Sequence, residues 1–287
     1  MRRRGRTIVN SGWLPPAPAG WEEVLKLSLS EDLGSGDISA SLLPDDLKVD
    51  WYIEAQADGV LCGAGIAYDL LSGDDDIVCH LQDGAAVSGG SKILSGTSPA
   101  QTLLTLERTA LNFLMHLSGA ASLTRRFVDA ITGTNARIVD TRKTLPGMRV
   151  LDKYAVRCGG GSNHRMGLFD GVMIKDNHIR ALGGITRAVA LAKASAHHLL
   201  KIEVECETLD QVAEAVAAGA EVVMLDNMSL ESMQTAVDRY RGKAVLEASG
   251  GVNLATVRSI AETGVDLISV GAITHSANAL PFHLEVQ

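Results

Sequence analysis

The fold class is clearest in residues 201–227, KIEVECETLDQVAEAVAAGAEVVMLDN. Two apolar runs rich in branched residues, beginning near Ile202 and Val222, flank an amphipathic stretch with the period of a helix. Thr208 is a good N-cap for that helix, and Gly219 is a typical residue to end it. A continuous apolar strand, a crossover helix and a second strand indicate a parallel sheet that is covered on both faces.

The same unit repeats along the second half of the chain. Ser229 and Asn253 are expected to cap the two later helices, which run to about Arg241 and Gly264. Regular repetition of strand and helix favours closure of the sheet into a barrel. The remaining strands are expected at residues 136–139 and 171–174 and from near Ala244 and Leu267 onward.

The composition of the chain limits its class. With 287 residues, of which 46% are hydrophobic, the chain can build one large barrel domain or two domains. The net charge is -8 and the sequence pI is about 5.5, whereas a protein that binds nucleic acid presents a basic face. Nucleic acid is therefore not expected as a partner.

Neither a membrane segment nor a targeting signal is expected. No apolar stretch follows the basic residues 1–6, and no later run is long enough to span a bilayer. Residues 1–20 end in a proline-rich run and are expected to form a disordered arm. The cysteines form no CxxC pair, which predicts reduced thiols in the cytoplasm rather than a zinc site or disulfides. They are Cys62, Cys79, Cys158 and Cys206.

Polar residues or glycine follow each expected strand. In a (β/α) barrel, the carboxyl ends of the strands form the edge where catalytic and binding groups converge. Taken singly, Asp226 could cap a helix, Glu205 could be a surface charge and Gly271 could lie in a plain turn. Taken together, the strand ends predict a site at the barrel mouth. They carry Asp140-Thr141-Arg142-Lys143, Lys175-Asp176-Asn177-His178, Glu205, Asp226-Asn227, Ser249-Gly250-Gly251 and Gly271.

Residues 137–175 form a basic stretch in this acidic chain. They hold eight Lys and Arg against three Asp, which predicts a small phosphorylated or carboxylated ligand. Arginine grips a carboxylate or phosphate with two bonds, and lysine acts as a point charge. By contrast, the spacing of Arg149, Lys153 and Arg157 by four predicts a solvated helix face. The expected positive side of the site consists of Arg142, Lys143, His164, Arg165 and Lys175.

Another part of the mouth is expected to hold phosphate and a metal ion. Gly250-Gly251 and Gly271 let backbone N–H groups approach a phosphate closely, although such glycines are also ordinary turn residues. Glu205 and Asp226, on consecutive strands, could hold a hydrated Mg2+ ion or accept hydrogen bonds from sugar hydroxyls.

Long motifs in the chain match a known family. The central ones are DTRKTLPG (residues 140–147), KYAVRCGGG (153–161), NHRMGL (163–168) and IKDNH (174–178). Others are EDLG (31–34), ERTALNFL (107–114), LDN (225–227), EASGG (247–251), ETGVD (262–266) and SVGA (269–272). On these motifs the chain closely resembles quinolinate phosphoribosyltransferase.

The resemblance implies an enzyme of NAD biosynthesis. Such an enzyme converts quinolinate and phosphoribosyl pyrophosphate into nicotinate mononucleotide, pyrophosphate and CO2, and it uses Mg2+. The resemblance also implies an N-terminal α/β sandwich-like domain, residues 21–112 with 278–287, and an irregular open (β/α) barrel domain, residues 113–277. Because the family forms dimers with sites at the subunit boundary, a homodimer or a higher homo-oligomer is expected.

The resemblance further implies roles for the residues at the strand ends. The two carboxylates of quinolinate would be bound by Arg142, Lys143, His164 and Arg165. The implied catalytic set is Lys143 and Lys175, which would meet pyrophosphate, and Glu205 and Asp226, which would lie near ribose and magnesium. The other implied binding residues are Thr141 and the 5′-phosphate loops Ser249-Gly250-Gly251 and Ser269-Val270-Gly271.

Arg108 is assigned by the resemblance alone. From the residues around it, Arg108 is one charge on an amphipathic helix. The resemblance implies that Arg108 of the partner subunit completes the quinolinate site.

Two other functions remain open from the residues themselves. Lys175 at a strand end could be the Schiff-base lysine of an aldolase, which borohydride would trap with a carbonyl substrate. Alternatively, the chain could be a non-catalytic module that binds phosphoribosyl pyrophosphate and releases no pyrophosphate when quinolinate is added.

Overall fold

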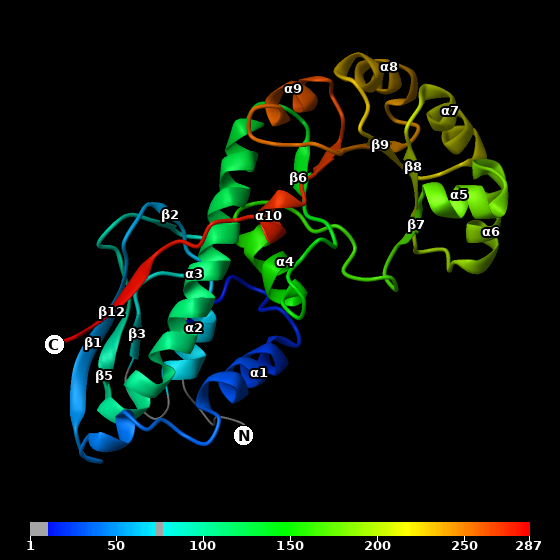
Figure 1. The fold of residues 1–287 in the computed structure, drawn as a ribbon. Coiled ribbons are helices and arrows are strands. Elements are labelled where there is room, and N and C mark those ends of the chain that lie inside the picture. The colour runs from blue at the N-terminus through cyan, green and yellow to red at the C-terminus, as the bar shows by residue number, and fades with distance from the viewer. Residues whose placement is uncertain (1–10, 73–76) are drawn as a thin grey trace. The chain divides into compact units, whose positions relative to one another are not determined.

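The structure, a computed structural model, describes residues 11–72 and 77–287, which fold into two compact units (Figure 1). Unit 1 holds the described residues up to Arg125, together with Leu145–Gly160 and Ser276–Gln287. Unit 2 holds Arg126–Thr144 and Gly161–His275. This division differs from the predicted boundary at residue 113, because one helix, α3 (Ala100–Ala130), runs through that point without interruption.

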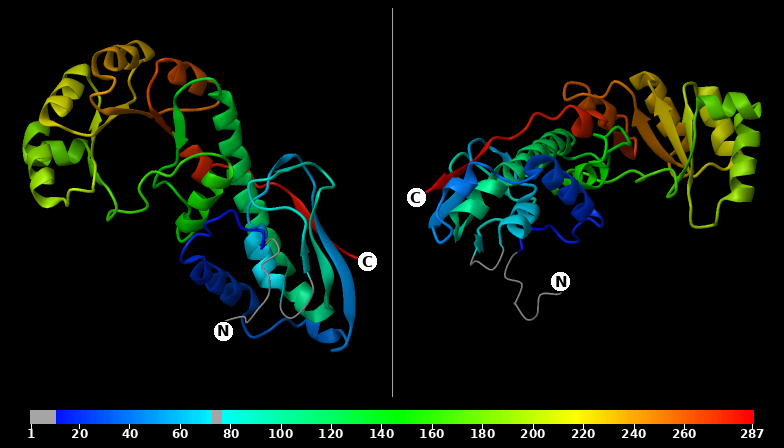
Figure 2. Two further views of the ribbon diagram at one scale, coloured as in Figure 1. Left: turned by 180° about the vertical axis from the view of Figure 1, so that it is seen from behind. Right: turned by 60° about the horizontal axis from the view of Figure 1, so that its bottom comes forward.

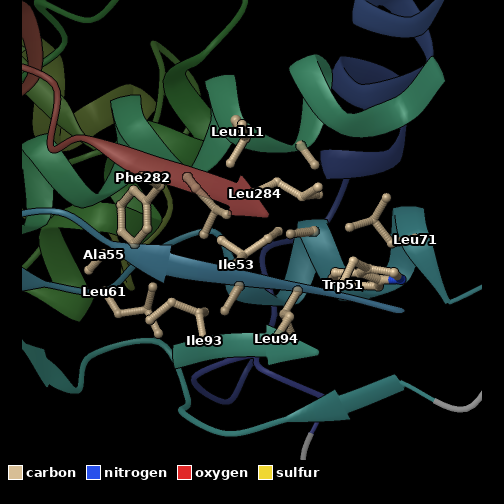
Figure 3. Close-up of a cluster of buried hydrophobic side chains, with 14 of the residues drawn as sticks. Trp51, Ile53, Ala55, Leu61, Leu71, Ile93, Leu94, Leu111, Phe282 and Leu284 are labelled. Atoms are coloured by element: carbon tan, nitrogen blue, oxygen red, sulfur yellow. The ribbon is translucent and has the colours of Figure 1, made fainter. Parts of the chain in front are cut away.

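Unit 1 is built around an antiparallel sheet with the strand order β12-β1-β5-β3. The side chains of β1 alternate between buried and partly buried toward its end, as expected for a strand with one face in a core. Trp51 and Ile53 on β1 pack near Phe282 and Leu284 on β12 in this core (Figure 3). The sheet strands are β1 (Lys48–Ala55), β3 (Ile77–Cys79), β5 (Lys92–Pro99) and β12 (Phe282–Val286). The other elements of the unit are α1 (Trp21–Leu33), η1 (Ala40–Leu42), β2 (Gly59–Val60), α2 (Ala64–Leu71), β4 (Ala86–Val87) and α4 (Arg149–Cys158).

The segment before α1 is packed over the part that the structure describes. Trp13 is buried, its indole N–H donates to Asp69 at 2.9 Å, and its ring lies 5.0 Å from that of Trp21. The backbone N–H of Leu14 donates to the hydroxyl of Tyr154 at 2.7 Å. The predicted disordered arm is therefore wrong around Trp13, because a large ring with a partner for its N–H stabilises the ordered segment. Residues 1–10 lie outside the described residues.

Helix α4 does not present the solvated face that its charges predict. Lys153 is 1% exposed, and most of its neighbours along the helix are buried as well. Arg157 donates to the carbonyl of Pro16 at 2.6 Å and lies over the ring of Tyr154. A stripe of charges is solvated only when that side of the helix faces water, and α4 is covered on this side too. The prediction of a solvated face is therefore wrong for Lys153.

Two cysteines that are distant in the sequence meet inside unit 1. The thiols of Cys62 and Cys158 and a carboxylate oxygen of Asp83 all lie within 4.8 Å of one another. Asp83 accepts hydrogen bonds from the N–H of Ala64 at 2.8 Å and from the hydroxyl of Tyr154 at 2.8 Å, so it caps the start of α2. Spacing along the chain gives no sign of this cluster.

Helix α3 contains 31 residues, a length that exceeds the thickness of a bilayer. It carries charged residues along its length, including Glu107, Arg108 and Arg125. Among the described residues, no helix is both long and apolar enough to cross a membrane.

Unit 2 is an open barrel of parallel strands. The order of its strands is β6-β11-β10-β9-β8-β7. Consecutive strands from β7 to β11 are therefore neighbours in the sheet, and β11 pairs with β6. Among the described residues, no strand pairing joins β6 to β7, which leaves the barrel open there. Figure 1 and the rear view in Figure 2 show the helices on the outer side of the curved sheet. The predicted fold class is confirmed.

The strands of unit 2 begin within one residue of the predicted positions. They are β6 (Arg137–Val139), β7 (Val172–Ile174), β8 (Ile202–Cys206), β9 (Val222–Asp226), β10 (Val245–Ser249) and β11 (Leu267–Ser269). The helices are α5 (Asp176–Leu182), α6 (Ile185–Ser195), α7 (Leu209–Ala218), α8 (Leu230–Tyr240), α9 (Val257–Glu262) and α10 (Ala272–His275). This agreement follows from the continuous apolar runs, which few other local structures produce.

The predicted caps hold for two of three helices. The hydroxyl oxygens of Thr208 and Ser229 accept hydrogen bonds from the N–H groups of Gln211 and Ser232, at the starts of α7 and α8. Helix α9 begins at Val257, later than the prediction of a helix capped by Asn253. The side-chain oxygen of Asn253 instead accepts hydrogen bonds from the backbone N–H groups of Ala255 and Thr256, and it closes a turn that precedes the helix.

Candidate active site

The carboxyl ends of the strands in unit 2 surround one pocket of about 490 Å³. This is the end at which a (β/α) barrel collects its functional groups. Most of the residues that the sequence predicts for the site line this pocket, which brings side chains from six separate strand ends and their loops together. They are Thr141, Arg142, Lys143, His164, Arg165, Lys175, Glu205, Asp226, Ser249, Gly250, Gly251 and Ser269.

Two arginines form the positive wall of the pocket. The Nε of Arg142 is buried and has no hydrogen-bond partner among the described residues. The guanidinium of Arg165 is anchored by a bond of 3.0 Å to the carbonyl of Gly171. Burial lowers the pKa of Arg165, and the charge of Arg142 lowers it further. A buried donor without a partner and two positive charges that repel each other would both be stabilised by a bound anion.

Lys175 and Glu205 form an ion pair across the strand ends of β7 and β8. The carboxylate is 14% exposed and the lysine 45%, so the pair lies at the surface of the pocket rather than in its depth. A Schiff-base lysine needs an amine that is free to attack a carbonyl, whereas the Nζ of Lys175 is engaged by the carboxylate of Glu205. The geometry therefore opposes the aldolase alternative.

Asp226 and Asn227 lie at the end of β9 in a strained turn. Asn227 has φ 54°, and its side-chain amide donates to Asp226 at 2.7 Å. Its backbone N–H donates to the carbonyl of Ser249 at 2.9 Å, which ties this turn to the end of β10. Strained backbone of this kind persists where the surroundings impose it, and it is often found at functional sites.

The glycine after β10 is required by its surroundings. Gly250 has φ 90°, and a Cβ placed on it would lie 2.2 Å from the side-chain oxygen of Asn227. The next residue, Gly251, also has a positive φ of 62° but open space around it. Two successive glycines in this conformation expose backbone N–H groups at the rim of the pocket, which suits a bound phosphate.

We expect Gly250→Ala to weaken phosphate binding specifically. The substitution adds about 1–2 kcal/mol of backbone strain and forces Asn227 to move. The KM for the phosphorylated substrate should rise about tenfold or more, because the displaced backbone N–H groups lose charge-assisted bonds to the phosphate. Steady-state kinetics and thermal unfolding measure both effects.

Gly242→Ala is the matched control for Gly250→Ala. Gly242 has φ 79° with nothing within 4 Å of an added Cβ, and it is not part of the pocket lining. It should lose similar stability and keep its KM. An equal rise of KM in both variants would contradict a phosphate site at Gly250.

The strand end of β11 contributes mainly through its backbone. Ser269 lines the pocket, Val270 is 1% exposed, and the N–H of Val270 donates to the carbonyl of Val139 at 3.0 Å. A Cβ on Gly271 would lie 3.2 Å from the Cδ of Lys143, so this glycine gives room to the lysine stem. Of the predicted loop 269–271, Ser269 therefore lines the pocket, whereas the Val270 side chain belongs to the core.

His164 faces the interior of the barrel as well as the pocket. Its Nδ1 accepts the backbone N–H of Arg165 at 2.8 Å, and its Nε2 lies 3.0 Å from Glu203 and 3.8 Å from Glu247. The backbone N–H of His164 donates to Asp140 at 2.9 Å, which fixes the loop after α4 against the end of β6. The imidazole is thus held on three sides by groups of unit 2.

Sequence reasoning missed the two carboxylates next to His164. Glu203 and Glu247 lie inside β8 and β10 and are 6% and 1% exposed. Each has one oxygen that is buried without a hydrogen-bond partner among the described residues. The available signal was a glutamate inside an otherwise apolar strand, where a charge is costly to bury.

Arg108 lies in unit 1, on α3, and its side chain is 61% exposed. Its guanidinium is 3.8 Å from Glu107, a distance that makes this a weak surface ion pair. Nothing in the structure of the single chain assigns a role to this arginine.

Glu205 and Asp226 are the residues suited to a metal ion at the mouth. They supply carboxylate oxygens from consecutive strand ends of the same pocket, and oxygen ligands are those that Mg2+ prefers. Lys175 already pairs with Glu205, so few carboxylate oxygens remain for a metal ion. The site therefore suits an ion that keeps several water ligands and also contacts a bound ligand better than a fully dehydrated ion.

The fold and the site together define a class of enzyme. At one edge of an open (β/α) barrel lie paired arginines, two lysines, an acidic pair and the glycines Gly250-Gly251. Such a site is suited to transfer of a phosphorylated sugar onto an anionic acceptor. Models of the quinolinate phosphoribosyl transferase N-terminal and C-terminal domains match residues 37–118 and 120–285. The chain belongs to the quinolinate phosphoribosyltransferase family.

Individual relatives agree with this assignment. A probable nicotinate-nucleotide pyrophosphorylase [carboxylating] of Bacillus subtilis is 41% identical over 89% of this chain and 90% of its own length. The nicotinate-nucleotide pyrophosphorylase [carboxylating] of Mycobacterium leprae is 40% identical over 92% of this chain and 96% of its own. The crystal structure of nicotinate-nucleotide pyrophosphorylase from Ehrlichia chaffeensis matches with a TM-score of 0.90 and 41% identity, over 93% of this chain and 99% of that one.

Proposed function

We propose that this protein transfers the phosphoribosyl group of phosphoribosyl pyrophosphate to quinolinate, with loss of CO2, to give nicotinate mononucleotide and pyrophosphate for NAD biosynthesis. The observation that carries this proposal is the pocket at the barrel mouth, which combines two opposed guanidinium groups with an unpartnered buried donor on Arg142. A dicarboxylate offers one carboxylate to each of the two arginines.

The two substrates divide the pocket between them. Arg142, Arg165, Lys143 and His164 bind the carboxylates of quinolinate in this proposal. Lys143 and Lys175 meet the pyrophosphate of the second substrate, where their point charges suit several phosphate oxygens. The 5′-phosphate lies over Gly250-Gly251 and the loop 269–271, which offer backbone N–H groups. Glu205 and Asp226 face the ribose hydroxyls as hydrogen-bond acceptors.

A magnesium ion is part of the proposal, and Glu205 and Asp226 would hold it. When bound, the ion supplies positive charge that neutralises the diphosphate. The chain itself supplies the ammonium groups of Lys143 and Lys175, which stabilise the leaving pyrophosphate as its bond to the ribose lengthens. The ion pair with Glu205 holds Lys175 in place for this role.

The main contribution of the protein to bond formation is positioning. The arginines hold the quinolinate ring so that its nitrogen faces the ribose carbon that pyrophosphate leaves. Once this nitrogen is quaternary, the ring can accept the electron pair that the adjacent carboxylate leaves behind, and CO2 departs. The arginines therefore act twice, first by orienting the nitrogen and then by orienting the carboxylate that is lost.

We also propose that the enzyme is a cytoplasmic homodimer in which Arg108 of the partner subunit reaches the quinolinate site. The exposure of Arg108 supports this proposal, because its guanidinium has only a weak ion-pair partner among the described residues and is available to a second chain.

The test of the function is a comparison of acceptors. Quinolinate and nicotinate, each with phosphoribosyl pyrophosphate and Mg2+, are incubated with the protein while CO2 and the mononucleotide are measured. We expect equal amounts of CO2 and mononucleotide from quinolinate, and little product from nicotinate, because one carboxylate cannot satisfy both arginines. Turnover of nicotinate without turnover of quinolinate would contradict the proposal.

A further inference from the structure

A second cavity, of about 410 Å³, lies at the other end of the parallel strands of unit 2. Residues at the amino ends of the strands line it, among them Arg137, Val172, Val222, Val245 and Leu267. The mouth pocket is lined instead by residues at the carboxyl ends. His164, Arg165 and Glu247 line both cavities. These three side chains thus form the partition between the substrate pocket and the second cavity.

Glu247 supplies the carboxyl group of this partition. It is 1% exposed, and its Oε1 has no hydrogen-bond partner among the described residues. If Glu247 is ionised, this oxygen carries negative charge without a hydrogen bond, which is costly. A protonated carboxyl group is neutral, so its burial costs less. The geometry therefore suits a carboxyl group that carries a proton.

The backbone fixes the orientation of the neighbouring His164 ring. Its Nδ1 accepts the N–H of Arg165 at 2.8 Å, which directs Nε2 toward Glu203 at 3.0 Å and places it 3.8 Å from Glu247. The ring is therefore a fixed neighbour of Glu247 in the partition.

Several charged groups face Glu247 from the elements around it. Burial raises the pKa of Glu247 to about 7, and the charge of Glu203 on β8 and that of Asp140 after β6 act in the same direction. His164 in the loop after α4 and a hydrogen bond from Ser269 on β11 lower it. At neutral pH a substantial fraction of Glu247 therefore carries its proton.

The proposed reaction needs one proton at one carbon. When the bond between the ring carbon and the departing carboxylate breaks, CO2 leaves and the electron pair stays on that ring carbon. A proton must then form the new C–H bond, and its donor is left with one more negative charge. General acids that act in this way contribute about 100-fold to 10,000-fold to a rate.

We propose that Glu247 is the acid that protonates the ring carbon from which CO2 has left, and that a proton from bulk solvent returns to its carboxylate through water in the second cavity. The inference rests on the proposed function. In the step itself, the O–H bond of Glu247 breaks, the electron pair on carbon takes the proton, and the carboxylate of Glu247 remains. Return of a proton through the second cavity avoids passage through a mouth that product still occupies.

The test uses turnover of quinolinate by the full-length protein in equal parts of H2O and D2O. The deuterium content of the mononucleotide at the new C–H bond is measured by mass spectrometry for the wild type, Glu247→Gln and Glu231→Gln. Glu231 is an exposed glutamate on α8 and serves as the control. For Glu247→Gln we expect a kcat lower by about 100-fold or more, a changed deuterium content, and little change of either KM.

Two results would overturn the inference. One is a kcat for Glu247→Gln within about threefold of the wild type. The other is a lower kcat with the same deuterium content as the wild type, because a structural role alone leaves the proton donor unchanged. Release of CO2 by the wild type in the same assay checks the proposed function separately, since failure of that function abolishes CO2 in every sample.

The pH profile of the wild type gives a second test that does not need a variant to fold. An acid must be protonated to act, so the single-turnover rate of C–H bond formation should fall about tenfold per pH unit above the pKa of Glu247. Below that pKa the rate should be level with respect to this group. A rate that stays flat from pH 6 to about pH 9 would overturn the inference.

Discussion

Arg165→Ala and Arg142→Ala should each lower kcat/KM for quinolinate by about 100-fold to 1,000-fold. The two guanidinium groups repel each other in the pocket, where burial and the charge of Arg142 lower the pKa of Arg165. A dicarboxylate satisfies both groups at once and also reaches the buried Nε of Arg142. Removal of either arginine leaves one carboxylate in the pocket without a charge-assisted partner, which is costly where water is scarce.

The fold should survive these two substitutions. Neither arginine contributes to an apolar core, and truncation of Arg165 relieves the repulsion between the pair. Thermal unfolding should therefore show unchanged or slightly higher stability. Arg239→Ala, at an exposed position on α8, is the control and should keep full activity. Wild-type kinetics for Arg142→Ala or Arg165→Ala would remove that residue from the site.

A mixture of two inactive variants, Arg108→Ala and Arg142→Ala, should regain about a quarter of wild-type activity if subunits exchange freely. In a mixed dimer, the subunit that carries Arg108→Ala keeps its own Arg142 and receives an intact Arg108 of the partner subunit. The other site of the same dimer lacks both groups. Random pairing makes about half of the dimers mixed, each with one complete site. Activity is measured after the mixture has been incubated long enough for exchange.

A mixture of Arg142→Ala and Lys175→Ala is the control for this experiment. Both residues line the same pocket of one chain, so no pairing of the two variants makes a complete site. This mixture should stay inactive. If the first mixture also stays inactive although mass spectrometry detects mixed dimers, Arg108 does not act across the interface.

The sequence predicts those parts of the fold that depend on local pattern. The strands of the barrel follow from short apolar runs, and the caps at Thr208 and Ser229 follow from side chains that can accept a backbone N–H two or three residues later. Asn253 shows the limit of this reasoning, because the same side chain can close a turn as well as cap a helix. Both structures satisfy the local bonds, and packing decides between them.

The parts that the sequence does not predict depend on contacts between distant segments. Lys153 has the spacing of a solvated residue, yet other parts of unit 1 cover its helix. Glu203, Glu247 and His164 come from three separate segments, and only the curvature of the parallel sheet brings them together. The residues at the strand ends were predictable because the barrel edge collects them by its geometry, whatever the details of packing.

The pairing of β12 with β1 has a consequence for how the protein is made. Residue Phe282 lies beside Ala55 in the sheet of unit 1, so the edge of this sheet stays uncovered while the ribosome adds all the residues between them. Unit 2 is contiguous apart from α4 and its flanks, and it can reach a folded state before unit 1 is finished. The edge of β1 that β12 later covers is therefore the segment that a chaperone would need to shield during synthesis, because β5 already has β1 and β3 on its two sides.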